Sequence, residues 1–211
     1  MSERLLDPVD RICEILFGLI MAVTIVGSLS IATAGHEDVR TVMIAALGCN
    51  LAWGLVDAVM CLIRTATERR RKVTLLARLR ATQDKPEAHH LIKDALPQLF
   101  GSIVQPAALD ELHRGLLTVG EPTVRLDGRD YAAAFGVFAL VVLATFPVVI
   151  PFMFISQVML ALRVSNTLAV VTLFICGFAL GRYTGGRPLV SGLAMSGIGV
   201  ALLAIIIALG G

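Results

Sequence analysis

The sequence predicts an all-α membrane protein with five transmembrane helices and a small helical domain between the second and third of them. Of its 211 residues, 56% are hydrophobic and only 16% are charged, and the mean hydropathy is +0.82, outside the usual range of soluble domains. Five apolar runs are long enough to cross a bilayer. We therefore expect residues 1–64 to hold spans one and two, residues 65–130 to form a cytoplasmic helical domain, and residues 131–211 to hold spans three to five.

The positions of the basic residues predict the orientation of these spans. The expected spans run from Ile12 to Ala34, Val39 to Ile63, Tyr131 to Phe154, Val164 to Leu180 and Pro188 to Leu209. Sixteen of the 18 Lys and Arg residues then lie on one side of the membrane, against Arg40 and Arg163 on the other. Because basic residues favour the cytoplasmic side, we expect the N-terminus and the long loop in the cytoplasm and the C-terminus outside. Separately from this orientation, we expect the protein to lie in a bacterial inner membrane.

The first span begins with an acidic face. Asp7, Asp10 and Glu14 are spaced i, i+3, i+7, so in a helix they share one side. Asp7 followed by Pro8 is typical of a helix start. Carboxylates that enter a bilayer are costly unless a cation uses them, so Asp10 and Glu14 are candidate metal ligands.

The second span supplies further candidate ligands. Depth counted from the cytoplasmic ends places Glu14 and Asp57 in the same half of the membrane, and Asn50 lies two turns deeper than Asp57 on a similar face. Met60 and Cys61 add sulfur nearby. Carboxylate, amide and thioether ligands suit ferrous iron or manganese better than magnesium.

Two simpler interpretations stay open for these features. Glu14 could lie at the membrane interface, with Asp57 paired to Arg64 or Arg11 as a structural ion pair. The third span contains two prolines four residues apart in the segment 146–152. Such breaks line an ion path in some membrane proteins and are only kinks in others.

The second span is expected to continue as one helix out of the membrane, because no proline occurs between Arg40 and Lys85. Its basic run at residues 69–72 favours contact with lipid headgroups. Pro86 opens a second helix, whose apolar residues repeat at helical spacing through Leu99, and Pro106 opens a third. Three short helices bury little core alone, so we expect them to pack against a second copy of the chain or under the membrane domain.

The cytoplasmic helices hold a second candidate metal site. Glu87, His90 and Asp94 share one face at i, i+3, i+7, and Asp110 with His113 repeats the carboxylate-x-x-histidine spacing on the next helix. Carboxylates and imidazoles from facing helices bind iron or manganese in helical bundles. The alternative is an ordinary solvated surface, since the first face points away from the apolar stripe of its helix.

The sequence contains none of the common motifs for phosphate binding, zinc proteolysis or serine hydrolysis. We therefore expect no enzymatic activity and no bound cofactor. Basic charge with almost no interleaved aromatic residues also argues against nucleic-acid binding.

Several segments together resemble the vacuolar iron transporter family, in a divergent, bacterial-type form. They are Asp10 at the head of span one, residues 47–52 (Leu-Gly-Cys-Asn-Leu-Ala), residues 147–152 (Pro-Val-Val-Ile-Pro-Phe), and a cytoplasmic domain between spans two and three of five. The resemblance implies a homodimer with an ion path between the protomers. It implies export of ferrous iron or manganese from the cytosol in exchange for protons. Asp10 matches the family's ion-path aspartate, and Met60 stands near its second-span methionine.

A second hypothesis follows from two differences. Arg11 and Gly54 occupy positions where the family usually has glycine and aspartate. The alternative function is therefore a dimeric membrane scaffold or regulatory protein that retains the transporter fold without transport.

Overall fold

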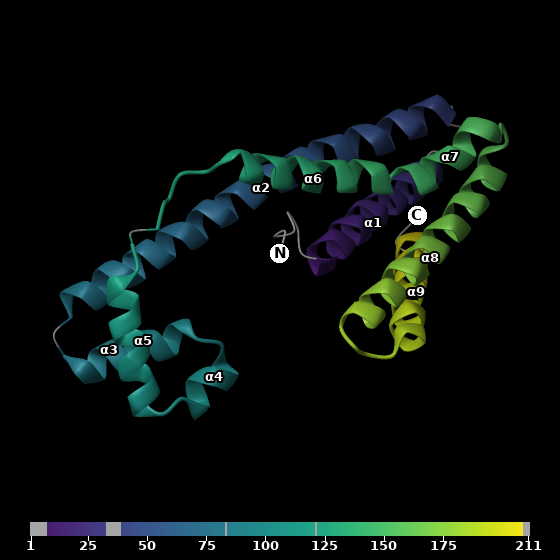
Figure 1. Cartoon of the computed structure of the whole chain (residues 1–211). Helices are drawn as coiled ribbons and strands as arrows, with labels where there is room; N and C mark the ends of the chain where they lie inside the picture. Colours follow the sequence, from purple (N-terminus) through teal and green to yellow (C-terminus); the bar gives the residue numbers. More distant parts are fainter. Residues whose placement is uncertain (1–7, 33–38, 83, 121, 209–211) are drawn as a thin grey trace. The chain divides into compact units, whose positions relative to one another are not determined.

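The computed structural model describes residues 8–32, 39–82, 84–120 and 122–208, and the regular structure in these ranges is entirely helical (Figure 1). The helices are α1 (Pro8–Ala32), α2 (Val39–Ala81), α3 (Lys85–Ala95), α4 (Gln98–Ile103), α5 (Pro106–Thr118), α6 (Gly128–Ala144), α7 (Phe146–Phe154), α8 (Val158–Tyr183) and α9 (Pro188–Ala208). The all-α prediction is confirmed.

Four stretches of helix among the described residues are long and apolar enough to cross a membrane. They are Arg40–Ala81, Gly128–Phe154, Val158–Tyr183 and Pro188–Ile205. These stretches indicate a membrane protein. Helix α1 has 25 residues but is not one of the four, so the five-span arrangement stays a prediction.

The fourth predicted span began too late. Helix α8 begins at Val158, whereas the predicted span began at Val164. The predicted span began directly after the charged Arg163, yet residues 158–163 are largely good helix formers without glycine or proline. Arg163 therefore lies inside a helix.

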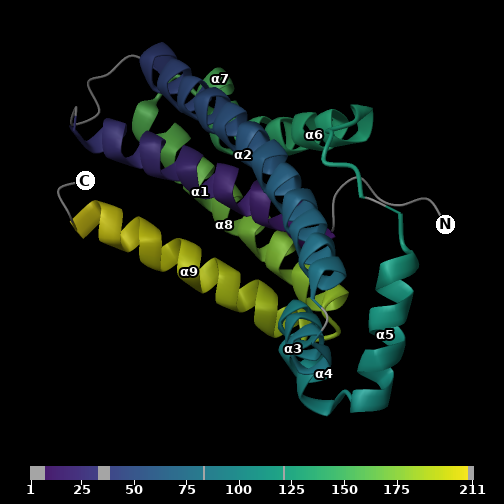
Figure 2. The same cartoon turned by 90° about the vertical axis from the view of Figure 1, so that its left-hand side faces the viewer.

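The chain divides into two compact units, one made of Met1–Cys61 with Gly128–Gly211 and the other of Leu62–Asp127. In the first unit, α1 packs against α6, α7, α8 and α9 (Figures 1 and 2). Leu19, Ala22 and Val26 on α1 are buried with Val148 of α7 and Ala169 of α8. Apolar side chains with helical spacing on α1 thus form the centre of this core.

Glycines bring α8 and α9 into close contact. A Cβ on Gly177 of α8 would lie 2.6 Å from the carbonyl oxygen of Ser191 and 2.8 Å from Cβ of Met195 on α9. On α9, a Cβ on Gly192 would lie 2.8 Å from the ring of Phe174. These glycines therefore act in helix packing.

The helix of the third predicted span is interrupted at Thr145, between α6 and α7. Pro147 has no amide hydrogen and cannot donate to the carbonyl of Leu143. At this break the carbonyl oxygen of Thr145 accepts hydrogen bonds from the backbone N–H groups of Val148 and Val149, each with an N···O distance of 3.1 Å. Pro151 remains inside α7, so of the two prolines only the first coincides with a break.

The second unit packs the end of α2 against α3 and α5, and α4 contacts α3. Leu79 of α2, Ala88 and Ile92 of α3, and Leu109 of α5 are buried together. The helix expected from Pro86 through Leu99 is divided, with α3 ending at Ala95 and α4 beginning at Gln98. Pro97 explains this difference, because a residue before proline avoids the helical region, and Leu96 has ψ of 150°.

Candidate functional site

Asn50 joins three parts of the first unit. Its side chain is fully buried on α2, and its Nδ2 donates to the carbonyl oxygen of Gly18 on α1 at 2.8 Å. The same nitrogen donates to Oγ1 of Thr145 at 2.6 Å. Asn50 thus connects α1 and α2 with the interruption between α6 and α7.

Local sequence explains why these groups meet. Gly18 lets α1 approach α6 so closely that a Cβ there would lie 2.7 Å from the Val141 carbonyl oxygen. Thr145 sits where Pro147 interrupts the helix, and its hydroxyl lies 3.4 Å from the Val141 carbonyl oxygen. A glycine, an interrupted helix and a short amide side chain therefore create one buried polar point in an apolar core.

The remaining polar atom of Asn50 has no partner among the described residues. Its Oδ1 is buried and accepts no hydrogen bond. Leaving a buried acceptor unpaired costs about 1–3 kcal/mol, so such an atom in a well-packed core calls for an explanation. Both hydrogens of the amide point to protein acceptors, which leaves this oxygen available to a cation or a water molecule.

Asp57 lies on the same stripe of α2. Asn50, Gly54, Asp57 and Cys61 follow at i, i+4, i+7 and i+11, which places them along one face. Gly54 and Cys61 are buried and Asp57 is half-buried. The Oδ2 atom of Asp57 is itself buried without a hydrogen-bond partner among the described residues. Within the described ranges, the stripe thus carries two buried oxygen atoms without hydrogen-bond partners on one apolar helix.

Glu14 of α1 lies at a similar level along the helix axis to Asp57 of α2. The rings of Phe17 and Trp53 meet edge to face with centroids 5.8 Å apart, next to the hydrogen bond from Asn50 to α1. Because α1 and α2 run in opposite directions (Figures 1 and 2), Glu14 and Asp57 both lie toward the N-terminal end of α1 from this contact. Asp10 and Glu14 are half-buried.

Met60 is placed differently from the other sequence candidates. Its side chain is 55% exposed, whereas the stripe of α2 that contains Asn50 and Gly54 is buried. Within this chain, Met60 therefore contributes nothing to the buried stripe.

The candidates in the second unit do not form one cluster, because among the described residues no group of three His, Cys, Asp or Glu side chains could hold a metal ion. His90 and Asp94 pair within α3 at 3.0 Å, and both are largely exposed. Glu87 is exposed beside them. His113 is half-buried on α5, and its Nε2 has no partner among described residues.

Asp110 pairs with a histidine that the sequence did not single out. Nε2 of His89 lies 2.9 Å from Oδ1 of Asp110 and links α3 to α5. This hydrogen bond lowers the pKa of Asp110, and the positive charges of Lys85 and Arg114 lower it further. The His-His pair at 89–90 was a visible signal, because adjacent residues on a helix point about 100° apart and one of the two can face a neighbouring helix while the other faces solvent.

Sequence reasoning also missed Gly18 and Thr145. The signal for Thr145 was a hydroxyl two residues before proline in an apolar run, a place where helix carbonyls lose their partners. The signal for Gly18 was a small residue in an apolar helix. Neither signal identifies Asn50 as the partner, since the contacts are long-range.

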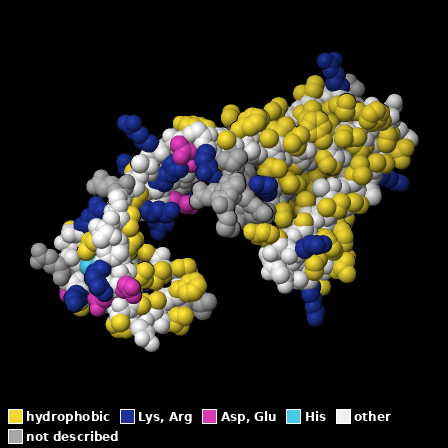
Figure 3. Space-filling view, in the orientation of Figure 1, with side chains coloured by type: hydrophobic (Ala, Val, Ile, Leu, Met, Phe, Trp, Pro, Cys, Tyr) yellow, Lys and Arg dark blue, Asp and Glu magenta, His cyan; other side chains and the backbone are white. Residues whose placement is uncertain are grey.

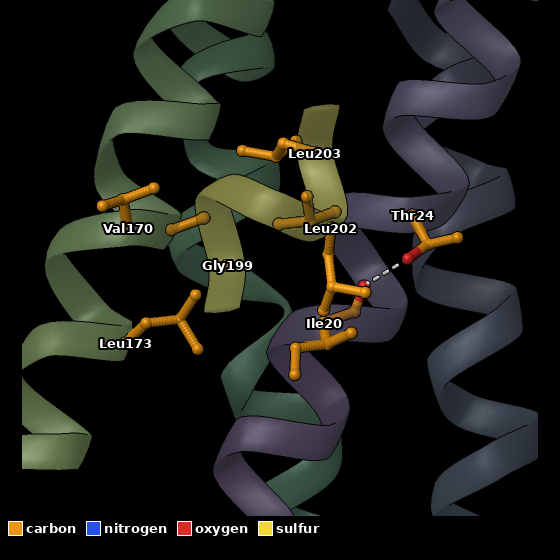
Figure 4. A pocket seen from close by; sticks show the side chains of 9 residues that line it. Ile20, Thr24, Val170, Leu173, Gly199, Leu202 and Leu203 are labelled. Carbon is orange, nitrogen blue, oxygen red and sulfur yellow. Dashed lines mark hydrogen bonds between the residues drawn. The ribbon is translucent and has the colours of Figure 1, made fainter. Parts of the chain in front are cut away.

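A small pocket between α1, α8 and α9 is apolar and too small for a ligand. It is lined by Ile20, Val23, Thr24, Ala169, Val170, Leu173, Gly199, Leu202 and Leu203, with about 10 Å³ open to the centre of a water-sized sphere (Figure 4). That volume is at the lower limit for one water molecule. The hydroxyl of Thr24 donates to the Ile20 carbonyl within α1 at 2.8 Å, so no polar group is left to orient a ligand.

In the residues that the structure describes, the fold and the site indicate an all-helical membrane protein, because four stretches of helix are long and apolar enough to span a membrane. Comparison with known family models and with curated proteins gave no match.

Proposed function

We propose that this protein transports a divalent transition metal, ferrous iron or manganese, out of the cytosol in exchange for protons. In this proposal the chain forms a homodimer with five spans per protomer. The N-terminus and the second unit lie in the cytoplasm. The observation that carries the proposal is the buried Oδ1 of Asn50, at the interruption between α6 and α7, which has no hydrogen-bond partner in the described parts of the chain.

The depth of Asn50 fits an ion path. It lies eleven residues after Val39, the first residue of α2, or about 17 Å along the helix at 1.5 Å per residue. This is close to the middle of a hydrocarbon core about 30 Å thick. Transporters place ion sites at this depth, where interrupted helices leave polar backbone groups for the ion.

The chemistry of the stripe fits a divalent cation. Asp57 and Cys61 offer a carboxylate and a thiol one turn apart on one face of α2, and Asn50 offers an amide oxygen about 10 Å further along the helix, so an ion would meet these ligands in turn. An ionisable residue within a membrane span is a functional candidate because its burial is otherwise costly. Mixed oxygen and sulfur ligands favour iron or manganese over magnesium. Glu14 and Asp10, at the N-terminal end of α1, would form the cytoplasmic entrance.

The test is metal flux into liposomes that contain the full chain. We expect wild-type protein to admit Mn²⁺ or Fe²⁺, and Asn50→Ala to lower the rate roughly tenfold or more, from loss of one buried interaction of 1–3 kcal/mol. Thr167→Ala is a matched control, because the Thr167 hydroxyl is exposed and bonds only within α8. This control should transport like wild type.

The two hypotheses predict different outcomes. A folded wild-type chain that admits neither ion would refute transport and favour the non-transporting dimeric scaffold. Folding is checked through the fluorescence of Trp53, the only tryptophan, which contacts Phe17 across the α1–α2 interface.

A further inference from the structure

The second half of α2 is strongly basic. From Arg64 to Ala81 the helix carries seven Lys or Arg residues and one carboxylate, Glu68. The helix is continuous from Val39 to Ala81, and Arg64 directly follows the last apolar residue of the predicted span, Ile63. The basic residues thus lie on a direct extension of an apolar helix. Hydrophobic side chains cover much of the first unit, to which the apolar half of this helix belongs (Figure 3).

Two of these cations have structural roles inside the second unit. Arg69 donates to the carbonyl oxygen of Arg125 and lies 3.8 Å from the carboxylate of Asp127. Arg80 donates to the carbonyl oxygen of Val119 at 2.8 Å. Both hold the segment that follows α5 against α2, so these two arginines are occupied within the protein.

Four other cations form a separate face, which we call the basic face. It consists of Arg64, Arg70, Arg71 and Arg78, all exposed. At 100° per residue they fall within an arc of about 120°, centred opposite the buried Leu76. In the part of the chain that the structure describes, the guanidinium groups of these four residues make no hydrogen bond or ion pair within the protein, in contrast to those of Arg69 and Arg80.

The part of the basic face nearest to the predicted span lies within reach of a membrane surface. Arg70 and Arg71 follow Ile63 by seven and eight residues, or about 10–12 Å along the helix. Electrostatic attraction to an anionic surface extends over a Debye length of about 8 Å at physiological salt, and an arginine side chain adds its own length. Guanidinium groups bind phosphate oxygens through paired donors.

We propose that the basic face binds the phosphate groups of anionic lipids through its three cations nearest to the predicted span, Arg64, Arg70 and Arg71, and so fixes the point at which α2 leaves the bilayer. These three residues lie within about 12 Å of Ile63 along the helix, whereas Arg78, about 22 Å from Ile63, is too far from the bilayer to take part. The separation of these three cations from the two arginines with structural roles leaves the internal contacts of the second unit intact when lipid binds. This binding does not depend on metal transport and would persist in a protein that moves no ion.

The test is binding of fluorescent phosphatidylglycerol, compared with phosphatidylcholine, to the full chain in a neutral detergent. We expect Arg70→Gln with Arg71→Gln to weaken phosphatidylglycerol binding roughly thirtyfold, from the loss of two cations at an anionic surface. The matched control, Lys85→Gln with Lys93→Gln, removes the same charge from exposed positions of α3 and should bind like wild type.

Several outcomes would overturn the proposal. They are equal affinity for the two lipids, a glutamine double variant that binds like wild type, or a control that loses as much affinity. If the glutamine variant fails to fold, the wild type still provides a test, since added salt must weaken phosphatidylglycerol binding. An affinity insensitive to salt would contradict electrostatic binding. Arg70→Lys with Arg71→Lys keeps the charge and should retain most of the binding.

Discussion

Replacement of Gly18 by alanine tests the contact that assembles the Asn50 site. A Cβ at this position would lie 2.7 Å from the carbonyl oxygen of Val141 and 3.2 Å from Cβ of Ala144. The first distance is too short and involves backbone, so α1 and α6 must separate. Overpacking of this kind costs about 1–3 kcal/mol, while alanine gains up to about 1 kcal/mol over glycine in a helix.

Gly48→Ala is the matched control, because a Cβ on Gly48 of α2 would meet nothing within 4 Å. The helix-propensity gain is common to both variants, so the difference between them should equal the overpacking cost of about 1–3 kcal/mol. Thermal unfolding in detergent, followed by the emission of Trp53, measures this difference. We expect Gly18→Ala to unfold at a lower temperature than Gly48→Ala and to shift the emission. Equal unfolding temperatures would refute the close contact of α1 with α6.

Two further predictions concern other contacts. Gly177→Ala should destabilise the α8–α9 pair by about 1–3 kcal/mol relative to Gly197→Ala, since a Cβ on Gly197 would meet nothing within 4 Å; equal unfolding temperatures would contradict the packing role. The pKa of Asp110 is lowered by His89 from its ordinary value of 3.8, so its stabilising effect is complete above that value and is lost as the pH falls through the lowered pKa. Unfolding measured as a function of pH should show that the stability of Asp110→Asn is less sensitive to acid than that of wild type. The exposed Glu111→Gln is the control and should resemble wild type. An unchanged acid dependence for Asp110→Asn would argue against a stabilising His89–Asp110 pair.

Local sequence signals predicted much of the helical structure. The continuation of α2 to Ala81 followed from the lack of proline between Arg40 and Lys85, because only a helix breaker would have ended it. The division between α3 and α4 was missed although Pro97 was visible. The prediction of a single helix from Pro86 through Leu99 relied on the helical spacing of its apolar residues and neglected the helix-breaking effect of Pro97.

The candidate site was predicted only in part. Asn50 and Asp57 stood out because polar side chains are rare in apolar helices. Their surroundings depend on contacts between distant segments, such as the 95 residues that separate Asn50 from Thr145. Such contacts follow from how helices pack, which a single sequence does not specify. The same limit applies to His89, which is paired across helices with Asp110 while its neighbour His90 faces outward.

The most direct test of the proposed transport is Mn²⁺ entry into liposomes that contain Asp57→Asn. This change keeps the size of the side chain and removes the negative charge of the carboxylate, whose buried Oδ2 has no hydrogen-bond partner among the described residues. Asp94→Asn is the control, since Asp94 is exposed on α3. Our account predicts that Asp57→Asn falls to the rate of empty liposomes while Asp94→Asn transports like wild type. Wild-type flux in folded Asp57→Asn protein would contradict the account.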